Sequence, residues 1–262
     1  VINADIPESS EIVRVSKARG LRVVRYGFSE GAEIRIVDRR AVSTGQDLTL
    51  DVLGKSYAVH LNLVGAFQAM NVLCAMGLVL SDSSVCVDDV IAALPHLPGV
   101  VGRLQSVPHD VSQVGVYVDY AHTPDGLETI LTALRPHTSR KLVCVFGCGG
   151  DRDRGKRPVM GEIAARLADT VIVTDDNPRS EDPEFIRSEI VAGIPAGKDV
   201  LNIGGRRNAI HAAVSLLQPG DVLVLAGKGH EEGQIFATHT EPFNDLTEAQ
   251  AALRTLSSSL SS

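Results

Sequence analysis

The sequence lacks three features that would each point to a particular class of protein. The longest apolar run extends only from Val72 to Leu80, far short of the roughly 20 residues of a membrane-spanning helix. Basic residues are not in excess, since the net charge is −7, which argues against nucleic acid or an anionic membrane as the main partner. The cysteines show no metal-site pairing, which indicates reduced thiols in a cytoplasmic protein: Cys74, Cys86, Cys144 and Cys148.

A secretory leader is also missing, and the chain begins at Val1 rather than at methionine. We therefore expect a piece of a longer protein or a processed product. The 262 residues suffice for one large or two ordinary domains. Hydrophobic residues make up 44% and charged residues 22%, which is the balance of a globular protein. We expect this protein to be a monomer.

The first quarter of the chain is rich in short segments typical of β-strands. Four such segments cover residues 22–28, 33–40, 47–54 and 56–62. The pair Gly54-Lys55 predicts a tight hairpin turn. From Gly65 the apolar residues recur at helical spacing, and a second short helix is expected over 87–94. Prolines and glycines within 95–102 then predict a linker.

After this linker, apolar segments alternate with helical patterns. Strands are expected over 114–120, 141–146, 170–174, 200–203 and 222–227, and helices over 124–134, 158–167, 183–192 and 208–217. Strands that are apolar throughout and alternate with helices predict a mainly parallel sheet with helices on both faces, the doubly wound α/β class. The serine-rich tail, 256–262, is expected to be disordered.

Polar loops follow four of the predicted strands. They cover residues 119–126, 147–157, 174–183 and 226–234. In doubly wound sheets, ligands bind beyond the carboxyl ends of the strands, where such loops meet. We therefore expect these loops to form one binding site.

The loop 147–157 contains the G-x-x-x-x-G-K spacing of a phosphate-binding P-loop, which ends here at Lys156. Arg157 stands where that motif needs a hydroxyl for Mg²⁺, and Asp151 and Asp153 would repel a phosphate. A solvated charged loop is the plainer alternative. We favour a third interpretation, a site for a zwitterion, because adjacent arginine and aspartate side chains can hold a carboxylate and an ammonium together.

The loops 174–183 and 226–234 carry the same mixed charge. Pro178 stiffens the backbone beside Arg179, whose guanidinium can then grip a carboxylate as a bidentate fork; an ordinary Asn-Pro turn is the alternative. Gly227 and its neighbour Gly229 let the backbone approach a ligand, and Glu231 supplies a negative charge. Taken alone, Glu231 is as easily an ordinary solvated side chain.

Three further polar residues each allow two interpretations. Asp119 ends a strand and can bond a ribose hydroxyl or stabilise the start of the next helix. His122 can polarise a phosphate or act as a cap. Asn71 lies in an apolar helical stretch, where its amide can read a base edge or satisfy a backbone group.

Six segments, taken together and in order, resemble one known family: 60–75, 98–107, 118–131, 145–164, 174–183 and 226–234. The resemblance is to the Mur ligases, most closely to the members that add the third residue of the peptidoglycan stem peptide. It implies amide-bond formation through an acyl phosphate, with ATP and Mg²⁺ as cofactors. The implied substrates are a UDP-N-acetylmuramoyl dipeptide and meso-diaminopimelate.

The resemblance also implies an arrangement of domains. Residues 1–98 would be the C-terminal portion of the central ATPase domain and 99–102 a linker. Residues 103–262 would be the C-terminal, Rossmann-like domain that binds the amino acid. The true P-loop of the family is absent from this sequence, which implies that the polypeptide cannot ligate by itself.

Particular residues acquire roles through the same resemblance. The set that would bind diaminopimelate is Arg152, Asp176, Asn177, Pro178, Arg179, Gly227 and Glu231. The two arginines suit the distal carboxylate, while Glu231 and the Gly227 carbonyl suit the distal ammonium. ATP contacts would come from Asn71, Arg103 and Asp119, and His122 is the one catalytic candidate. No metal ligands are expected in this part of the chain.

Alternatives from other classes stay open at this point. The chain can be an amino-acid-binding module without turnover, or a lysine-adding relative. Lysine-adding members of the family lack the arginine of the D-N-P-R run at 176–179, since lysine has no distal carboxylate. A Rossmann-type oxidoreductase would need G-x-G-x-x-G after its first strand, and no such run is present.

Overall fold

The computed structural model describes residues 1–260 and falls into two compact units. We call them unit 1, Val1–Pro98, and unit 2, which begins at Gly99. Each unit has its own sheet and its own hydrophobic core, so each is described by itself. Within residues 1–260, no helix combines the length and the apolar character that crossing a bilayer requires.

Unit 1 is built on a five-stranded sheet in the order β1-β2-β3-β4-β5. Its strands are β1 Ile2–Asn3, β2 Arg25–Gly27, β3 Ile34–Val42, β4 Gly45–Val52 and β5 Lys55–Leu61. The pairs β1–β2 and β2–β3 are parallel, whereas β3, β4 and β5 form an antiparallel meander. Its helices are α1 Ser9–Ala18, α2 Ala66–Val79 and α3 Val87–Ala93, followed by the 3-10 turn η1 Leu94–His96.

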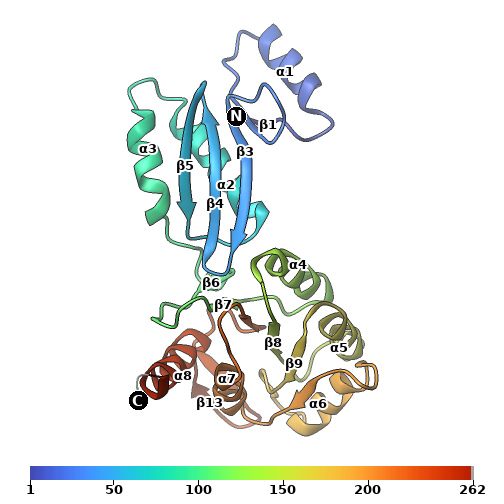
Figure 1. Cartoon of the computed structure of the whole chain (residues 1–262). Helices are drawn as coiled ribbons and strands as arrows, with labels where there is room; N and C mark the ends of the chain where they lie inside the picture. The colour runs from blue at the N-terminus through green and yellow to red at the C-terminus, as the bar shows by residue number, and fades with distance from the viewer. Residues whose placement is uncertain (261–262) are drawn as a thin grey trace. The chain divides into compact units, whose positions relative to one another are not determined.

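The core of unit 1 follows from the alternation of apolar residues along β3 and β4. Ile34 and Ile36 on β3 are almost completely buried, as are Leu48 and Leu50 on β4, because every second side chain of a strand points to the same face. The helix α2 lies against the sheet, behind the long strands in Figure 1, and contributes Leu73 to the same core.

Two local predictions for unit 1 are wrong. The turn between β4 and β5 lies at Leu53-Gly54 rather than at Gly54-Lys55, because Lys55 already pairs with Val52. Both turn residues have a positive φ, 53° and 86°, as a type I′ hairpin turn requires. The apolar pattern predicts no helix before Gly65, yet Ser9–Ala18 forms α1.

Unit 2 contains a six-stranded sheet in the order β10-β9-β8-β11-β7-β6. Its strands are β6 Gln105–Ser106, β7 Gly115–Asp119, β8 Leu142–Phe146, β9 Thr170–Val173, β10 Val200–Asn202 and β11 Val222–Ala226. All neighbours pair in parallel except β6, which lies antiparallel to β7 at one edge. Every residue of β7, β8, β9 and β11 is buried, which accounts for their unbroken apolar sequences.

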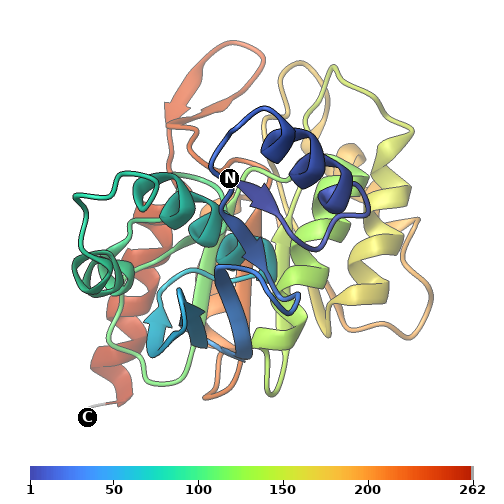
Figure 2. The ribbon, with the colours of Figure 1, turned by 90° about the horizontal axis from the view of Figure 1, so that it is seen from above.

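Helices cover both faces of this sheet. In Figures 1 and 2, α4 Pro124–Leu134, α5 Lys156–Leu167 and α6 Pro183–Val191 lie on one side, and α7 Arg206–Ser215 and α8 Asp245–Leu260 on the other. The 3-10 turn η2 Arg135–His137 follows α4, and a small hairpin, β12 Gly233–Ile235 with β13 Thr240–Pro242, precedes α8. The doubly wound α/β class predicted for this half of the chain is confirmed.

The end of the chain differs from its prediction. A disordered tail is expected over 256–262, but α8 continues to Leu260; residues 261 and 262 lie outside the described part of the chain. Ala249, Ala252 and Leu253 of α8 are at most 3% exposed in the core of unit 2. Their burial at helical spacing stabilises the helix that carries the serines.

Candidate functional site

The four predicted loops meet in unit 2 around one cavity of about 640 Å³. It is lined by Tyr120, His122, Thr123, Pro124, Gly149, Arg152, Asp153, Gly155, Lys156, Val159, Asp176, Asn177, Arg179, Gly227 and Glu231. These residues follow β7, β8, β9 and β11 in the sequence. The four loops therefore meet at one cavity, as their positions after strands of one sheet predict.

The topology of the sheet explains this position. The chain passes from β7 through α4, α5 and α6 along one face, and returns through α7 on the other face to β11, in the middle of the sheet. The strand β11 lies between β7 and β8, so loops that lead toward opposite faces leave from neighbouring strands. A crevice opens at such a reversal of strand order, and it is the usual ligand site of doubly wound sheets.

Two arginines line the cavity with donors to spare. Arg179 has a left-handed backbone, with φ of 52°, and its Nη1 donates to the Gly150 carbonyl at 2.8 Å. Its Nε and Nη2 have no hydrogen-bond partner among residues 1–260. Arg152 is exposed, and its Nη1 donates to the carbonyl of Asp151 at 3.0 Å. Both guanidinium groups can therefore still donate to an anion such as a carboxylate.

The floor of the cavity includes the buried Asn177 and the half-buried Glu231, and the buried Lys228 lies behind them. Lys228 Nζ donates to Glu231 Oε2 at 2.8 Å and to Asn177 Oδ1 at 3.0 Å. Asn177 Nδ2 donates to the same Glu231 oxygen at 2.9 Å. Asp176 lies slightly farther away, with its Oδ1 at 3.9 Å from Lys228 Nζ. An ammonium, an amide and two carboxylates are thus concentrated at one end of the cavity.

The two acids of this network respond to it in opposite ways. Burial opposes the ionisation of Glu231, but its hydrogen bonds to Lys228 and Asn177 outweigh burial and hold its pKa below the usual range. Burial raises the pKa of Asp176, and the nearby Arg206 and Lys228 only partly offset this effect. Glu231 is therefore ionised at neutral pH and can meet a cation in the cavity.

The G-x-x-x-x-G-K loop does not have the contacts of a P-loop. Lys156 Nζ donates to the carbonyl of His122 at 2.7 Å. Arg157, in the position of the metal-binding hydroxyl, is completely buried and forms ion pairs with Glu181 and Glu189. Within residues 1–260, no group of His, Cys, Asp and Glu side chains is arranged to hold a metal ion. The loop instead holds Arg152 at the rim of the cavity.

Direct backbone contacts join the loops that carry the two arginines. Gly150 N donates to the carbonyl of Asn177 at 2.9 Å, and Ser180 Oγ donates to Asp151 at 2.6 Å. A Cβ atom on Gly150 would lie 1.9 Å from the carbonyl oxygen of Pro178, so only glycine fits there. The separation of Arg152 and Arg179 is therefore set largely by the main chain.

The residues predicted to bind the amino acid gather at this cavity, apart from Pro178, which is buried next to it and shapes the loop. The residues predicted to contact ATP are divided between the two units, with Asn71 in unit 1 and Arg103 and Asp119 in unit 2. Asn71 is exposed on α2 in unit 1, with its Nδ2 donating to Gln68. Arg103 belongs to unit 2, and its guanidinium lies 5.3 Å from the ring of Tyr120.

Two other predicted residues have mainly local partners. Asp119 is 4% exposed, and its carboxylate accepts the backbone N–H of Leu104 and of Ala121, both at 2.7 Å. These two hydrogen bonds hold the carboxylate of Asp119 in place at the end of β7. His122 lines the cavity, and its Nδ1 lies 2.8 Å from the carbonyl of Tyr120.

Sequence reasoning missed several residues at the site. Lys228, at the floor, carried no specific role in the sequence, although a lysine between two glycines in a strand-end loop was a usable signal. Tyr120 also lines the cavity, with its ring 5.2 Å from that of His230. Thr123 is the N-cap of α4, as its position before Pro124 predicts, and accepts from Gly126 N at 3.2 Å.

The fold and the cavity together define an α/β protein with a charged ligand site at the switch point of its sheet. Comparison with known proteins gives the family. The profile described as "Mur ligase, glutamate ligase domain" matches residues 102–229, and "Mur ligase middle domain" matches 1–79. The chain belongs to the Mur ligase family and comprises parts of its middle and C-terminal domains.

Three similar proteins carry the same name, UDP-N-acetylmuramoyl-L-alanyl-D-glutamate--2,6-diaminopimelate ligase. The protein of Caulobacter vibrioides is 50% identical over 97% of this chain and 51% of its own length. That of Brucella melitensis is 54% identical over 88% of this chain and 43% of its own length. A solved structure is 34% identical, with a TM-score of 0.83, over 98% of this chain and 53% of its own. The chain thus spans about half the length of the curated relatives that it matches.

Proposed function

We propose that this chain carries the amino-acid-binding part of a ligase that adds meso-diaminopimelate to UDP-N-acetylmuramoyl-L-alanyl-D-glutamate. The names of its relatives support both substrates. The observation that carries the proposal is the charge arrangement of the cavity, with two arginines that have unused donors and one ionised glutamate. That arrangement matches the distal end of meso-diaminopimelate, which bears one carboxylate and one ammonium.

The chain's own residues would bind and orient this amino acid. The guanidinium of Arg179 would form a bidentate pair with the distal carboxylate, and Arg152 would close over it from the rim. Glu231 and the carbonyl of Gly227 would accept from the distal ammonium. Fixing the distal end in this way places the amino group at the other end for attack, and such positioning is a large part of catalysis in reactions between two substrates.

ATP and Mg²⁺ supply carboxylate activation in this family, but the described residues do not fit the triphosphate and its metal. Lys156, the lysine of the P-loop-like run at 150–156, donates to a backbone carbonyl. Arg157 forms ion pairs with Glu181 and Glu189. We therefore derive no step of the reaction from this chain's contacts to ATP. Three residues are proposed as contacts to ATP: Asn71 to the adenine, Arg103 to a phosphate or the ribose, and Asp119 to the ribose. His122 is proposed as a contact near the reacting groups.

The same proposal includes the domain boundaries, the cellular location and the oligomeric state. Residues 1–98 would be the C-terminal portion of the central domain, 99–102 the linker and 103–262 the C-terminal domain of a cytoplasmic, monomeric ligase. The end of this linker is joined to unit 2, because the carbonyl of Gly102 accepts Tyr120 N at 2.8 Å. A Cβ on Gly102 would lie 2.5 Å from His230 N, so only glycine fits at the end of the linker.

The proposal is tested by calorimetry of the 262-residue chain with meso-diaminopimelate and L-lysine. We expect binding of meso-diaminopimelate to be much tighter, because lysine lacks the distal carboxylate. Arg179→Ala should weaken binding by about 2–5 kcal/mol, since a desolvated carboxylate would lose its partner. Arg166→Ala, which removes an arginine paired with Glu128 away from the cavity, is the matched control. Equal affinity for the two ligands would contradict the proposal and favour a lysine-adding relative.

A further inference from the structure

Lys228 is a completely buried lysine that contacts Asn177 and Glu231, two residues that line the cavity, but it does not line the cavity itself. Lysine side chains are almost never fully buried unless they are paired. Because Lys228 is completely buried and is not exposed in the cavity, its ammonium does not reach a ligand directly. Any effect of Lys228 on the ligand must therefore pass through the residues that it contacts.

The ammonium of Lys228 joins the two loops that supply the acidic end of the cavity. It donates to Glu231 Oε2 at 2.8 Å within its own loop, and to Asn177 Oδ1 at 3.0 Å in the loop after β9. Asn177 Oδ1 also accepts the backbone N–H of Ile235 at 3.0 Å. Both of these groups can only donate, so they fix which atom of the Asn177 amide is the oxygen.

This fixed amide then determines how Glu231 is presented. With Oδ1 toward Lys228, the Asn177 nitrogen donates to Glu231 Oε2 at 2.9 Å. That oxygen accepts two hydrogen bonds, whereas Glu231 Oε1 has none from residues 1–260. Since Glu231 lines the cavity, Oε1 is the oxygen left for a ligand. Without Lys228, one donor to Oε2 would disappear and the orientation of the Asn177 amide would be weakly determined.

We propose that Lys228 is a positioning residue that makes the cavity selective for a ligand with a distal ammonium, by holding Glu231 so that its Oε1 faces that group. The proposal rests on the function proposed above, because it takes meso-diaminopimelate as the ligand. It adds a residue that does not touch the ligand and yet determines which ligand is preferred. A purely structural lysine would support the fold without affecting the choice between ligands.

The test uses two ligands that differ only in the distal amine, meso-diaminopimelate and 2-aminopimelate, with calorimetry of the 262-residue chain. Lys228→Met keeps the apolar stem and removes the ammonium. We expect this variant to lower the affinity for meso-diaminopimelate by about tenfold or more, which corresponds to about 1.4 kcal/mol. Its affinity for 2-aminopimelate should stay within about twofold of the wild-type value. Glu231→Gln should have the same selective effect, and the double variant should lose little more than either single variant.

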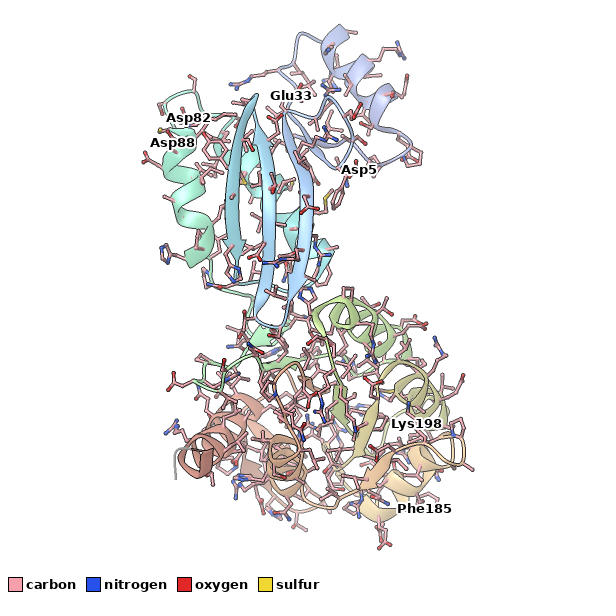
Figure 3. All side chains as sticks on the ribbon, in the orientation of Figure 1. Asp5, Glu33, Asp82, Asp88, Phe185 and Lys198 are labelled. Atoms are coloured by element: carbon pink, nitrogen blue, oxygen red, sulfur yellow. The ribbon has the colours of Figure 1, made fainter. Side chains whose placement is uncertain are left out.

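A pH series gives a second readout that a structural role would not move. Burial opposes the ionised form of Glu231, whereas Lys228, Asn177 and Arg206 favour it, and the charge of Glu231 in turn raises the pKa of Asp176. Removing Lys228 should therefore raise the pH at which affinity for meso-diaminopimelate is lost on acidification. Lys198→Met, which removes a lysine of the loop before β10 labelled in Figure 3, should change neither affinity nor pH profile.

Each outcome bears on one of the two proposals. If wild-type chain does not prefer meso-diaminopimelate over 2-aminopimelate, the ammonium site itself is wrong, and this inference falls with it. If wild type shows the preference but Lys228→Met weakens both ligands equally, or neither, only the positioning role is overturned. Should Lys228→Met fail to fold, Lys228→Gln, which keeps a polar tip without the charge, is measured in its place with the same expected result.

Discussion

The two units treat polar side chains differently. In unit 1, all of which the structure describes, the buried polar side chains are those of Ser9 and Gln46, and neither is charged. Unit 2 buries several charged side chains close to its cavity, namely Arg157, Asp176, Arg206, Lys228 and Asp245. Burying a charge costs free energy unless it is paired and hydrogen-bonded. Unit 2 therefore depends on ion pairs that unit 1 does not need.

The acids of unit 1 show the opposite arrangement. Figure 3 labels Asp5, Glu33, Asp82 and Asp88, which lie at or near the surface of this unit. Their pKa values are all lowered, and in each case hydrogen bonds to the carboxylate are the cause that lowers them. Such exposed or half-exposed contacts contribute little to stability. Charged side chains therefore form ion pairs in the interior of unit 2, whereas in unit 1 their contacts lie at or near the surface.

The largest loss of stability is expected when Arg206, in the interior of unit 2, is replaced. Its guanidinium donates to both carboxylate oxygens of Asp245 at 2.7 Å, and both side chains are completely buried. Arg206→Met should destabilise unit 2 by about 3–5 kcal/mol, because it leaves an unpaired buried carboxylate. Denaturant unfolding measures this loss, and hydrogen exchange assigns it to unit 2. Adding Asp245→Leu should recover most of it; failure to recover would mean that the pair does more than neutralise charge.

A smaller effect is expected at Glu181, which the buried Arg157 holds in place. Its hydrogen bonds to Arg157 and to Asp151 N lower its pKa from 4.5 to about 2. A carboxyl whose pKa is lowered in the folded state stabilises the fold above its unfolded pKa, and this contribution is lost as the pH falls from about 4.5 through about 2. Glu181→Gln should cost about 1–2 kcal/mol at pH 7.

The same variant tests how the stabilisation by Glu181 depends on pH. Thermal midpoints of the wild type and Glu181→Gln, measured between pH 6 and pH 2, should converge as the pH falls, because protonation removes the ion pair that the variant already lacks. If the thermal midpoints of the two proteins differ by the same amount at every pH, the charge of Glu181 does not contribute to stability.

The smallest effect should be found in unit 1, at the pair formed by Arg25 and Glu33. The two side chains are each 34% exposed, and Arg25 Nη2 lies 2.9 Å from Glu33 Oε1. Glu33→Gln should cost less than about 1 kcal/mol, and high salt should reduce this difference further. Hydrogen exchange in β2 and β3 measures it. A loss as large as that at Arg206 would remove the distinction between the two units.

Much of unit 2 was predictable because its strands are apolar throughout and its helices are periodic. The rule that ligands bind at the carboxyl edge of such a sheet then selected the four loops that line the cavity, without any side-chain geometry. α1 was not predictable in the same way, since Ile12, Val13 and Val15 are β-branched residues that favour strands when taken locally. In α8, three apolar residues recur at helical spacing, namely Leu246, Ala249 and Leu253, but the serine-rich end of the helix is typical of a disordered tail.

The partners of charged residues were the part that the sequence could not supply. Arg157, in the first turn of α5, and Lys228, in the loop after β11, belong to charged segments that are typical of a solvated surface. Each is nevertheless completely buried. Arg157 pairs with Glu181 and Glu189, which follow it by 24 and 32 positions. Lys228 reaches Asn177, 51 positions earlier. Such pairing depends on the finished fold, so local pattern gives no sign of whether a charge faces water or another charge.

The contact between Gly150 and the carbonyl of Pro178 limits how this pocket can change during evolution. The main chain, rather than any exchangeable side chain, fixes the span between the loops of Arg152 and Arg179. A substitution at either arginine can alter the charge that the pocket offers, but it leaves the length of the pocket unchanged. A descendant that accepts an amino acid with a longer or shorter side chain would therefore have to remodel both loops together, a step that single substitutions do not provide.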